Sequence, residues 1–188
     1  MKRQIATDLD DVLADMTPFI DFHNSTFNTS LTISNFTSYY LRHVLKISRE
    51  EEWKRMRQFF NSPYFQQILP LEGSVEAVRY ISKKYEIAVI TSRPRFVRKN
   101  TEEWLGKYFP AIQKVYFTAD FPREKRKKSR ICLELRAETM IEDRLDYALD
   151  CSKSGIKVFL LDYPWNQISN LPPLIRRVKS WQEILREF

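Results

Sequence analysis

Short apolar segments of strand length alternate with stretches of helical spacing along most of the chain. These segments are residues 4–7, 86–91, 114–117, 139–141 and 157–161. Between them, apolar residues recur three or four positions apart, as on the buried face of an amphipathic helix. Continuous apolar strands separated by helices are typical of a parallel sheet with both faces covered. The pattern therefore predicts an α/β fold with a central parallel sheet between two helical layers.

Residues 17–72 interrupt this alternation with aromatic, polar and helix-forming residues and contain no clear strand. Within this stretch, residues 49–60 have the spacing of a helix. We interpret the whole stretch as a small helical cap inserted after the first strand. Residues 1–16 and 73–188 would then form a three-layer, Rossmann-like core.

Length and composition exclude several classes of protein. The chain has 188 residues, enough for one domain with a small insertion, and 43% are hydrophobic, which excludes intrinsic disorder as the main state. No run of about 18 apolar residues occurs, so we expect no transmembrane helix and no membrane partner. Asp8 comes before an apolar signal core could form, so we expect a cytoplasmic protein. The two cysteines, Cys132 and Cys151, are expected to be buried free thiols.

The chain carries an excess of positive charge, because 31 Lys and Arg against 24 Asp and Glu give a net charge of +7. A basic protein attracts phosphates, nucleotides or nucleic acid. Much of the excess lies in residues 123–130, which we interpret as the solvated start of a helix. The charge therefore leaves nucleic acid open as a partner without favouring it.

Acidic and hydroxyl side chains follow three of the predicted strands, where an open parallel sheet binds its ligands. They are Asp8, Asp10 and Asp11 after the first strand, Thr91 and Ser92 after the second, and Glu142, Asp143 and Asp146 after the fourth. Acids gathered at one edge repel each other unless a cation lies among them. Oxygen ligands suit Mg²⁺, which also accepts a substrate phosphate. The sequence therefore predicts a Mg²⁺ site at this edge of the sheet.

Each acidic pair also has a simpler interpretation. Asp8 and Asp10 could be a turn and a helix cap after a buried strand. Glu142 and Asp143 could complement the dipole at the start of a helix. Their occurrence together, and with Thr91, favours a functional site.

The order of these residues resembles that of the haloacid dehalogenase-like (HAD) phosphohydrolase superfamily. Four motifs carry the resemblance: Asp8-x-Asp10, Thr91 after an apolar strand, a lysine, and Glu142-Asp143 after another apolar strand. Residues 8–15 and 90–94 look most like the 5′(3′)-deoxyribonucleotidase branch, whose helical cap is similar to the predicted insertion.

The resemblance implies a phosphatase with Mg²⁺ as cofactor and a role for each acid. Asp8 would attack phosphorus and form an aspartyl-phosphate, and Asp10 would act as general acid and then as general base. Asp143 would be the main Mg²⁺ ligand, joined by Asp8 and by the backbone carbonyl of Asp10. Glu142 and Asp146 would hold waters of the metal ion.

The resemblance also implies a set of phosphate-binding residues after the second strand. Thr91 and the amide of Ser92 would bind phosphoryl oxygens. Arg93 would pair with the substrate phosphate or with its leaving group.

At two points the match to this superfamily is incomplete: the lysine of the third motif is ambiguous, and one residue of the first motif is unusual. The lysine of the third motif is Lys125, Lys127 or Lys128, and we choose Lys128 because it opens the helix leading to the fourth motif. Asp11 stands where most members have glycine, and it adds a negative charge near Asp8. This departure affects the expected fine geometry more than the expected activity.

Several ring-bearing residues of the insertion could stack on a nucleobase, although at helical spacing such residues more often form a cap's own core. They are Phe19, Phe22, His23, Phe36, Tyr39, Tyr40 and Trp53. The loop of residues 162–166 resembles a segment that follows the last strand in nucleotidase-like members, and we interpret it as structural.

These observations favour a Mg²⁺-dependent phosphomonoesterase whose substrate is small and phosphorylated, with a (deoxy)nucleoside monophosphate as the leading candidate. One alternative is a phosphatase for a sugar phosphate or a nucleic-acid 3′-phosphate. Another is a non-catalytic domain that binds a phosphorylated ligand or a protein partner on the same scaffold. A pure binding domain has no need of both Asp8 and Asp10, which argues against the last alternative. The sequence leaves the oligomeric state open.

Overall fold

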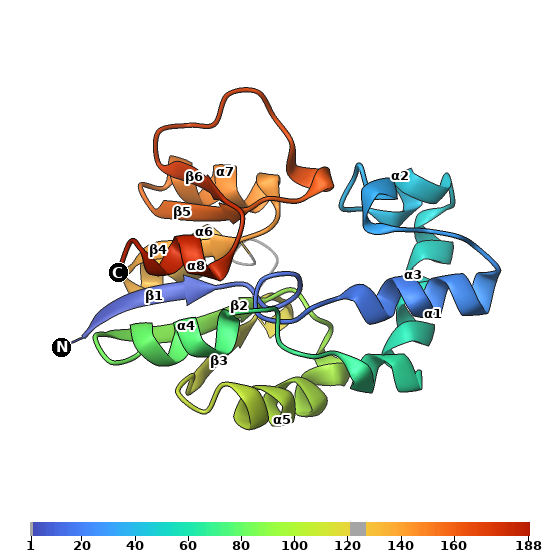
Figure 1. Cartoon of the computed structure of the whole chain (residues 1–188), viewed down its shortest axis with the longest axis horizontal. Coiled ribbons are helices and arrows are strands. Elements are labelled where there is room, and N and C mark those ends of the chain that lie inside the picture. Colours follow the sequence, from blue (N-terminus) through green and yellow to red (C-terminus); the bar gives the residue numbers. More distant parts are fainter. Residues whose placement is uncertain (1, 121–126) are drawn as a thin grey trace.

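The computed structural model describes residues 2–120 and 127–188 and has a parallel β-sheet at its centre (Figure 1). In the described residues the sheet has six strands in the order β3-β2-β1-β4-β5-β6. They are β1 (Arg3–Thr7), β2 (Tyr85–Thr91), β3 (Lys114–Phe117), β4 (Ala137–Glu142), β5 (Lys157–Leu161) and β6 (Ile175–Val178). All neighbouring strands are parallel. The predicted α/β fold is therefore confirmed.

The order of the strands decides where a ligand can bind. The chain runs from β1 to β2 and β3 on one side, and then crosses to β4 on the other side of β1. The loops after β1 and β4 therefore meet where the strand order reverses, which is the usual ligand site of such sheets.

The sequence analysis did not predict the sixth strand, β6. Its sequence Ile175-Arg176-Arg177-Val178 has two apolar residues, both buried, around two arginines. Among the described strands, β6 pairs with β5 alone and lies at the edge of the sheet. An edge strand with a polar centre lacks the continuous apolar run that marks the inner strands.

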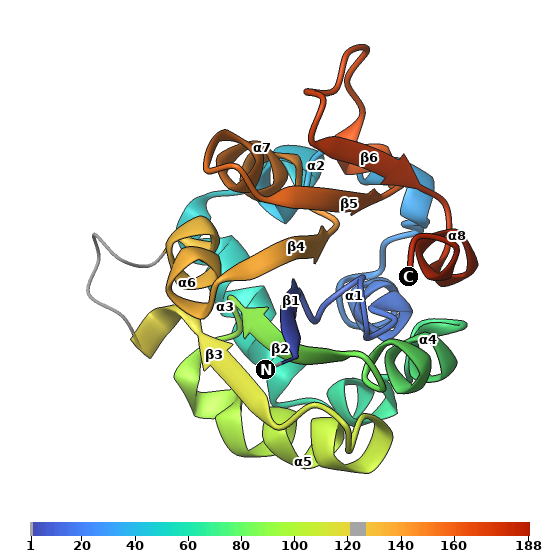
Figure 2. The ribbon, with the colours of Figure 1, turned by 90° about the vertical axis from the view of Figure 1, so that its left-hand side faces the viewer.

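Helices cover both faces of the sheet (Figure 2). They are α4 (Ser74–Ile81), α5 (Arg98–Tyr108) and α8 (Trp181–Leu185) on one face, and α6 (Lys128–Leu135) and α7 (Leu145–Lys153) on the other. Two short 3₁₀ turns, η3 (Arg95–Val97) and η4 (Thr118–Asp120), follow β2 and β3. Each face has its own apolar core, so the three predicted layers are present.

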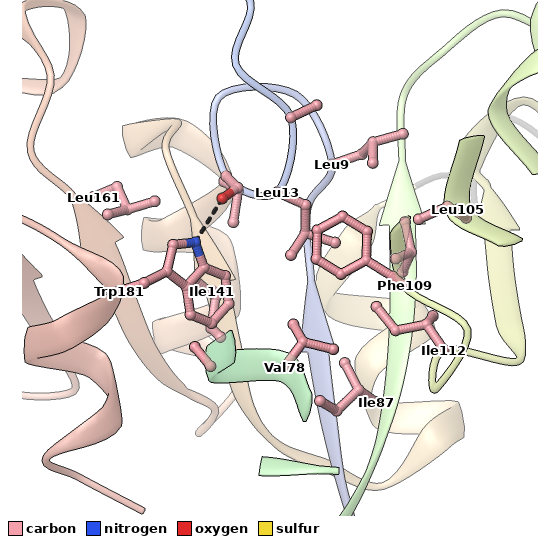
Figure 3. Packing of buried hydrophobic residues seen from close by; sticks show 14 of the residues in the cluster. Leu9, Leu13, Val78, Ile87, Leu105, Phe109, Ile112, Ile141, Leu161 and Trp181 are labelled. Carbon is pink, nitrogen blue, oxygen red and sulfur yellow. Dashed lines mark hydrogen bonds between the residues drawn. The ribbon is translucent and has the colours of Figure 1, made fainter. Parts of the chain in front are cut away.

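The loop after β1 is anchored in the core by its apolar residues. Leu9, Val12 and Leu13 are fully buried, and each such burial stabilises the fold by roughly 1.5–3 kcal/mol. The indole Nε1–H of Trp181 in α8 donates a hydrogen bond to the main-chain carbonyl of Val12 at 2.7 Å (Figure 3). The acids that alternate with these residues are therefore held at fixed positions above the sheet.

Residues 17–72 contain helices and no strand. The helices are α1 (Thr17–Phe27), α2 (Leu41–Leu45) and α3 (Arg49–Phe60), with the 3₁₀ turns η1 (Ile33–Asn35) and η2 (Pro63–Gln67). The helix predicted at residues 49–60 is confirmed as α3. Phe22 of α1 packs on Phe59 of α3 with ring centroids 5.6 Å apart, which gives these helices a small core of their own.

The two segments that link these helices to the sheet run side by side. The backbone N–H of Asp15 donates to the carbonyl of Leu69 at 2.9 Å, and that of Leu71 donates to the carbonyl of Leu13 at 2.7 Å. Figure 1 shows α1, α2 and α3 together at one end of the molecule, beyond the sheet. We therefore propose the same cap boundaries that the sequence suggests.

Two smaller expectations can be compared with the structure. In the described residues, no helix combines the length and the apolar character needed to cross a membrane. Cys132 and Cys151 are both free and buried, which confirms the prediction of buried thiols.

Candidate active site

Asp8, the residue directly after β1, shares a buried lysine with Glu142 at the end of β4. The Nζ of Lys128 lies 2.7 Å from Asp8 Oδ2 and 2.7 Å from Glu142 Oε1. Burial, followed by the charge of Glu142, raises the pKa of Asp8 to about 7, and Lys128 opposes this rise. Burial acts in the same direction on Glu142, but Lys128 and the N–H of Asp143 hold the pKa of Glu142 below its ordinary value.

The structure places the three candidate lysines differently. Lys128 is fully buried at the start of α6 and contacts Asp8. Lys127 has a side chain that is 68% exposed and pairs with Asp150. Lys125 lies outside the described residues. The geometry therefore brings Lys128, the lysine chosen from the sequence, to the candidate nucleophile.

Asp10 is held by an arginine from the loop after β2. The Nε and Nη2 of Arg93 donate to Asp10 Oδ1 at 3.0 and 2.6 Å, and Nη1 donates to Thr101 Oγ1 at 3.2 Å. Arg93 is buried, and its backbone N–H donates to Thr91 Oγ1 at 3.1 Å. Ser92 Oγ lies 3.2 Å from the hydroxyl of Tyr147. The residues predicted to bind phosphate thus adjoin Asp10, and in this structure Arg93 orients that carboxylate.

Asp143 completes a cluster of buried carboxylates. Asp8, Glu142 and Asp143 each offer an oxygen, and these oxygens lie within 4.8 Å of one another. Asp143 Oδ2 accepts a hydrogen bond from Trp165 Nε1 at 2.9 Å, whereas its buried Oδ1 has no partner among the described residues. Burial, and next the charge of Glu142, raises the pKa of Asp143 well above its ordinary value.

The oxygens of Glu142 already have partners. Oε1 accepts from Lys128, and Oε2 accepts from the backbone N–H groups of Asp143 at 2.8 Å and Arg144 at 3.3 Å. Asp8 Oδ2 and Asp143 Oδ2 also have partners, Lys128 and Trp165, so the oxygens left for a cation are Asp8 Oδ1 and Asp143 Oδ1. A buried carboxylate oxygen without a partner, in a cluster of oxygen donors, fits a hard divalent cation such as Mg²⁺.

Two further acids of the predicted set lie in other surroundings. The carboxylate of Asp146 is 58% exposed and pairs with Arg144 at 2.5 Å, so its proposed role toward metal-bound water stays a prediction. Asp11 has a φ of 55°, in the left-handed region that favours glycine and that aspartate tolerates better than most residues. Burial, and next the charge of Asp10, raises the pKa of Asp11. The backbone geometry explains why glycine is usual at this position in the superfamily.

A cavity of about 550 Å³ opens above Asp8 and Asp10 and is walled by residues of the cap. Five of the predicted ring-bearing residues line it: Phe19, Phe36, Tyr39, Tyr40 and Trp53. Phe22 and His23 are buried away from it, inside the cap. The cavity thus combines acids at one end with aromatic side walls, a composition typical of sites for ligands with a charged and a flat part.

Comparison with known proteins decides the family. A family model described as "5′ nucleotidase, deoxy (Pyrimidine), cytosolic type C protein" matches residues 2–187. The chain belongs to this family. It is therefore a phosphatase of the nucleotidase type, within the HAD superfamily, as the sequence motifs indicated.

Similar proteins agree with this assignment. A nucleotidase of Clostridium acetobutylicum is 28% identical over 180 residues, which cover 96% of this chain and 90% of that protein. A 5′(3′)-deoxyribonucleotidase of Bacillus subtilis is 26% identical over 195 residues, covering 100% of this chain and 99% of that protein.

Solved structures show the same fold. A HAD-like hydrolase from Streptococcus pneumoniae has a TM-score of 0.71 at 13% identity and covers 99% of this chain, with 98% of its own length matched. A HAD hydrolase from Bacillus subtilis, solved bound to magnesium, has a TM-score of 0.65 at 13% identity and covers 99% of this chain and 98% of its own.

Three arginines that the sequence analysis did not assign to the site line the cavity: Arg42, Arg49 and Arg144. The guanidinium of Arg144 lies 4.0 Å from the ring centroids of both Tyr39 and Tyr147, and its Nη2 donates to Tyr40 Oη at 3.1 Å. Arg144 lies in the loop after β4, whereas Tyr39 and Tyr40 lie in residues 17–72, the proposed cap. The sequence signal was its position directly after Asp143, but only the folded chain shows that it joins the two parts.

The loop of residues 162–166 also contributes to the site, which the sequence analysis did not predict. The sequence analysis treats it as structural, and its Asn166 is indeed fully buried. Its Trp165, however, lines the cavity and donates to Asp143. No spacing rule could pair these residues, because they follow different strands.

Proposed function

We propose that this enzyme is a Mg²⁺-dependent 5′-nucleotidase that hydrolyses (deoxy)nucleoside monophosphates through an aspartyl-phosphate on Asp8. The observation that carries the proposal is the position of Asp8: beside Lys128 and the unpartnered oxygen of Asp143, at the floor of the aromatic-walled cavity. The match of the family model over residues 2–187 supports a nucleotide as the substrate.

In the proposed first half-reaction, the two leading aspartates have different roles. Asp8 attacks phosphorus, the bond from phosphorus to the ester oxygen breaks, and that oxygen takes a proton from Asp10. Lys128 favours the charged, nucleophilic form of Asp8 against the effect of burial. Arg93 holds Asp10 on the cavity wall, two residues from the nucleophile.

The second half-reaction returns the enzyme to its starting state. Asp10 removes a proton from a water molecule that attacks phosphorus, the bond from phosphorus to Asp8 breaks, and inorganic phosphate leaves. Thr91, with the backbone N–H of Ser92, would bind the phosphoryl oxygens during both steps.

Asp8 and Asp143, with the backbone carbonyl of Asp10, would hold the cation. When bound, Mg²⁺ supplies positive charge that neutralises the phosphoryl oxygens and lowers their repulsion of the carboxylate nucleophile. The cavity volume of about 550 Å³ lies in the ordinary range for small-molecule sites, and its aromatic wall suits a nucleobase. Buried free thiols and the word "cytosolic" in the description of the matching family support a cytosolic enzyme.

The test is phosphate release from a panel of substrates. We would compare ribo- and deoxyribonucleoside monophosphates, sugar phosphates and a 3′-phosphorylated oligonucleotide, each with Mg²⁺ and with a chelator. Asp8→Asn should lower turnover by about 1,000-fold or more in a protein that stays folded, whereas the exposed Asp21→Asn should behave as wild type. Turnover by Asp8→Asn within tenfold of wild type would refute the covalent route. A sugar phosphate or the oligonucleotide as best substrate would refute the nucleotidase assignment alone.

A further inference from the structure

The loop after β5 is tied to the loop after β4 by a buried asparagine. Asn166, in the 3₁₀ turn η6 (Pro164–Asn166), donates from Nδ2 to the main-chain carbonyl of Asp143 at 2.6 Å and to that of Leu161 at 2.7 Å. Arg177 of β6 donates to the Asn166 carbonyl at 2.8 Å. Because buried, fully paired polar groups have few alternatives, this turn has a fixed position relative to Asp143.

The same turn places an indole against the carboxylate of Asp143. Trp165 Nε1–H donates to Asp143 Oδ2 at 2.9 Å. The Trp165 ring stacks on Tyr163 with centroids 4.3 Å apart and an interplanar angle of 6°. The stack restricts the indole to one orientation, so the hydrogen bond also restricts the carboxylate.

The two oxygens of Asp143 therefore differ. Oδ2 is occupied by the indole, and Oδ1 is buried without a partner among the described residues. A buried polar atom left unpaired destabilises the folded state, so such an atom in a native site points to a ligand. An indole N–H is a donor only and carries no charge, so it orients the carboxylate without neutralising it.

We propose that Trp165 is a positioning residue that holds Asp143 by Oδ2 so that Oδ1 is presented to the divalent cation. This inference rests on the cation site of the proposed function. It gives the loop of residues 162–166 a role in catalysis through Asp143, with no contact of its own to the cation. Groups that orient a metal ligand in this way typically change metal affinity or activity by about 10- to 100-fold.

The test separates the indole N–H from the ring. Trp165→Phe keeps an aromatic ring to stack on Tyr163 and removes the donor. Tyr163→Phe is the matched control, because it keeps the ring pair and removes only a hydroxyl. Mn²⁺ binding would be measured by the electron paramagnetic resonance signal of the free ion, and Asp143→Ala would show whether the ion binds at this site.

In Trp165→Phe we expect the dissociation constant for Mn²⁺ to rise about 10- to 100-fold, with kcat at saturating Mg²⁺ within about threefold of wild type. Tyr163→Phe should stay within twofold of wild type. Unchanged Mn²⁺ affinity in Trp165→Phe would overturn the role of the indole and leave the proposed function standing. A wild-type enzyme that binds no Mn²⁺, or an Asp143→Ala variant that binds it normally, would overturn the cation site itself.

A second measurement uses the wild-type protein and does not depend on how the variant folds. The indole ¹⁵N–¹H resonance of Trp165 should shift during a Mg²⁺ titration, with the same midpoint as the activation of phosphate release. The indole resonance of Trp104, which donates to the main-chain carbonyl of Ile68, should move little. A Trp165 resonance that does not move on saturation would overturn the proposal.

Discussion

Replacing the buried lysine of the site by methionine tests how its charges are balanced. Lys128 is fully buried, and its Nζ lies 2.7 Å from a carboxylate oxygen of Asp8 and 2.7 Å from one of Glu142. Lys128→Met keeps a similar volume and removes the positive charge. The two carboxylates then face each other without their shared partner.

The expected loss of stability follows from these distances. At an effective dielectric constant of about 20, a charge pair at 2.7 Å is worth about 6 kcal/mol, and the desolvation of each ion offsets several kcal/mol of this. Removing one partner of a buried pair costs about 3–5 kcal/mol. For a chain of this size, that loss corresponds to a fall of roughly 6–20 °C in the melting temperature.

The pH dependence of this loss has a definite sign. Burial and the charge of Glu142 raise the pKa of Asp8, and Lys128 opposes them. Without Lys128 the pKa of Asp8 therefore rises further. A carboxyl with a raised pKa in the folded state contributes stability that is present at low pH and is lost as the pH rises through that pKa. The deficit of Lys128→Met should therefore be smaller at pH 5 than at pH 8.

The assay is urea unfolding of wild type and variant at both pH values, in the presence of a chelator. Lys127→Met is the matched control, because the exposed Lys127 pairs with Asp150 among the described residues and should contribute less than about 1 kcal/mol. Lys128→Met should also lower turnover by about 100- to 1,000-fold. A deficit below 1 kcal/mol, or one that grows toward pH 5, would refute the charge balance described for this site.

Two further predictions concern His23 and Arg93. Burial, and next the charge of Arg55, lowers the pKa of the fully buried His23 to about 4, so the unfolded chain binds more protons than the folded one below pH 6.5. This difference in proton binding should lower the free energy of unfolding of the wild type by about 3 kcal/mol by pH 4. Urea unfolding at a series of pH values should show that the loss is absent in His23→Gln. Arg93→Lys removes the paired hydrogen bonds to Asp10 and should lower kcat about 10- to 100-fold in steady-state assays with little change in the melting temperature. Unchanged kcat would mean that Arg93 does not orient Asp10.

The central features of the fold and site could be predicted because they depend on local patterns. Asp8 and Asp143 follow apolar strands, and the carboxyl ends of parallel strands share one edge of the sheet. The same reasoning misses β6, whose two central arginines break the apolar run. An inner strand is buried on both faces and needs a continuous apolar run, whereas an edge strand does not. A single sequence does not show which strand lies at the edge.

The partners of the acids could not be predicted, because they come from distant segments. Arg93 reaches Asp10 across 83 positions, and Trp165 reaches Asp143 across 22. Arg93 was expected to contact substrate; the structure shows that it pairs with Asp10, and its contact with substrate stays a prediction. A basic residue near a strand end indicates that it will pair with an acid at this edge of the sheet. Which acid it pairs with depends on how the loops pack.

The partners divide the acids of this edge into two groups with different chemical uses. Lys128 and Arg93 give positive charge to Asp8 and Asp10, the residues proposed to react with substrate. Asp143 receives only the neutral N–H of Trp165, and no cationic side chain of the described residues pairs with it. A cationic partner at Asp143 would repel a divalent ion, whereas a neutral donor fixes the carboxylate and leaves its charge available. Asp8 would serve both uses, because its contact with Lys128 is made by Oδ2. The same edge can therefore activate a nucleophile and hold a cation, because Asp8 and Asp10 have cationic partners and Asp143 has a neutral one.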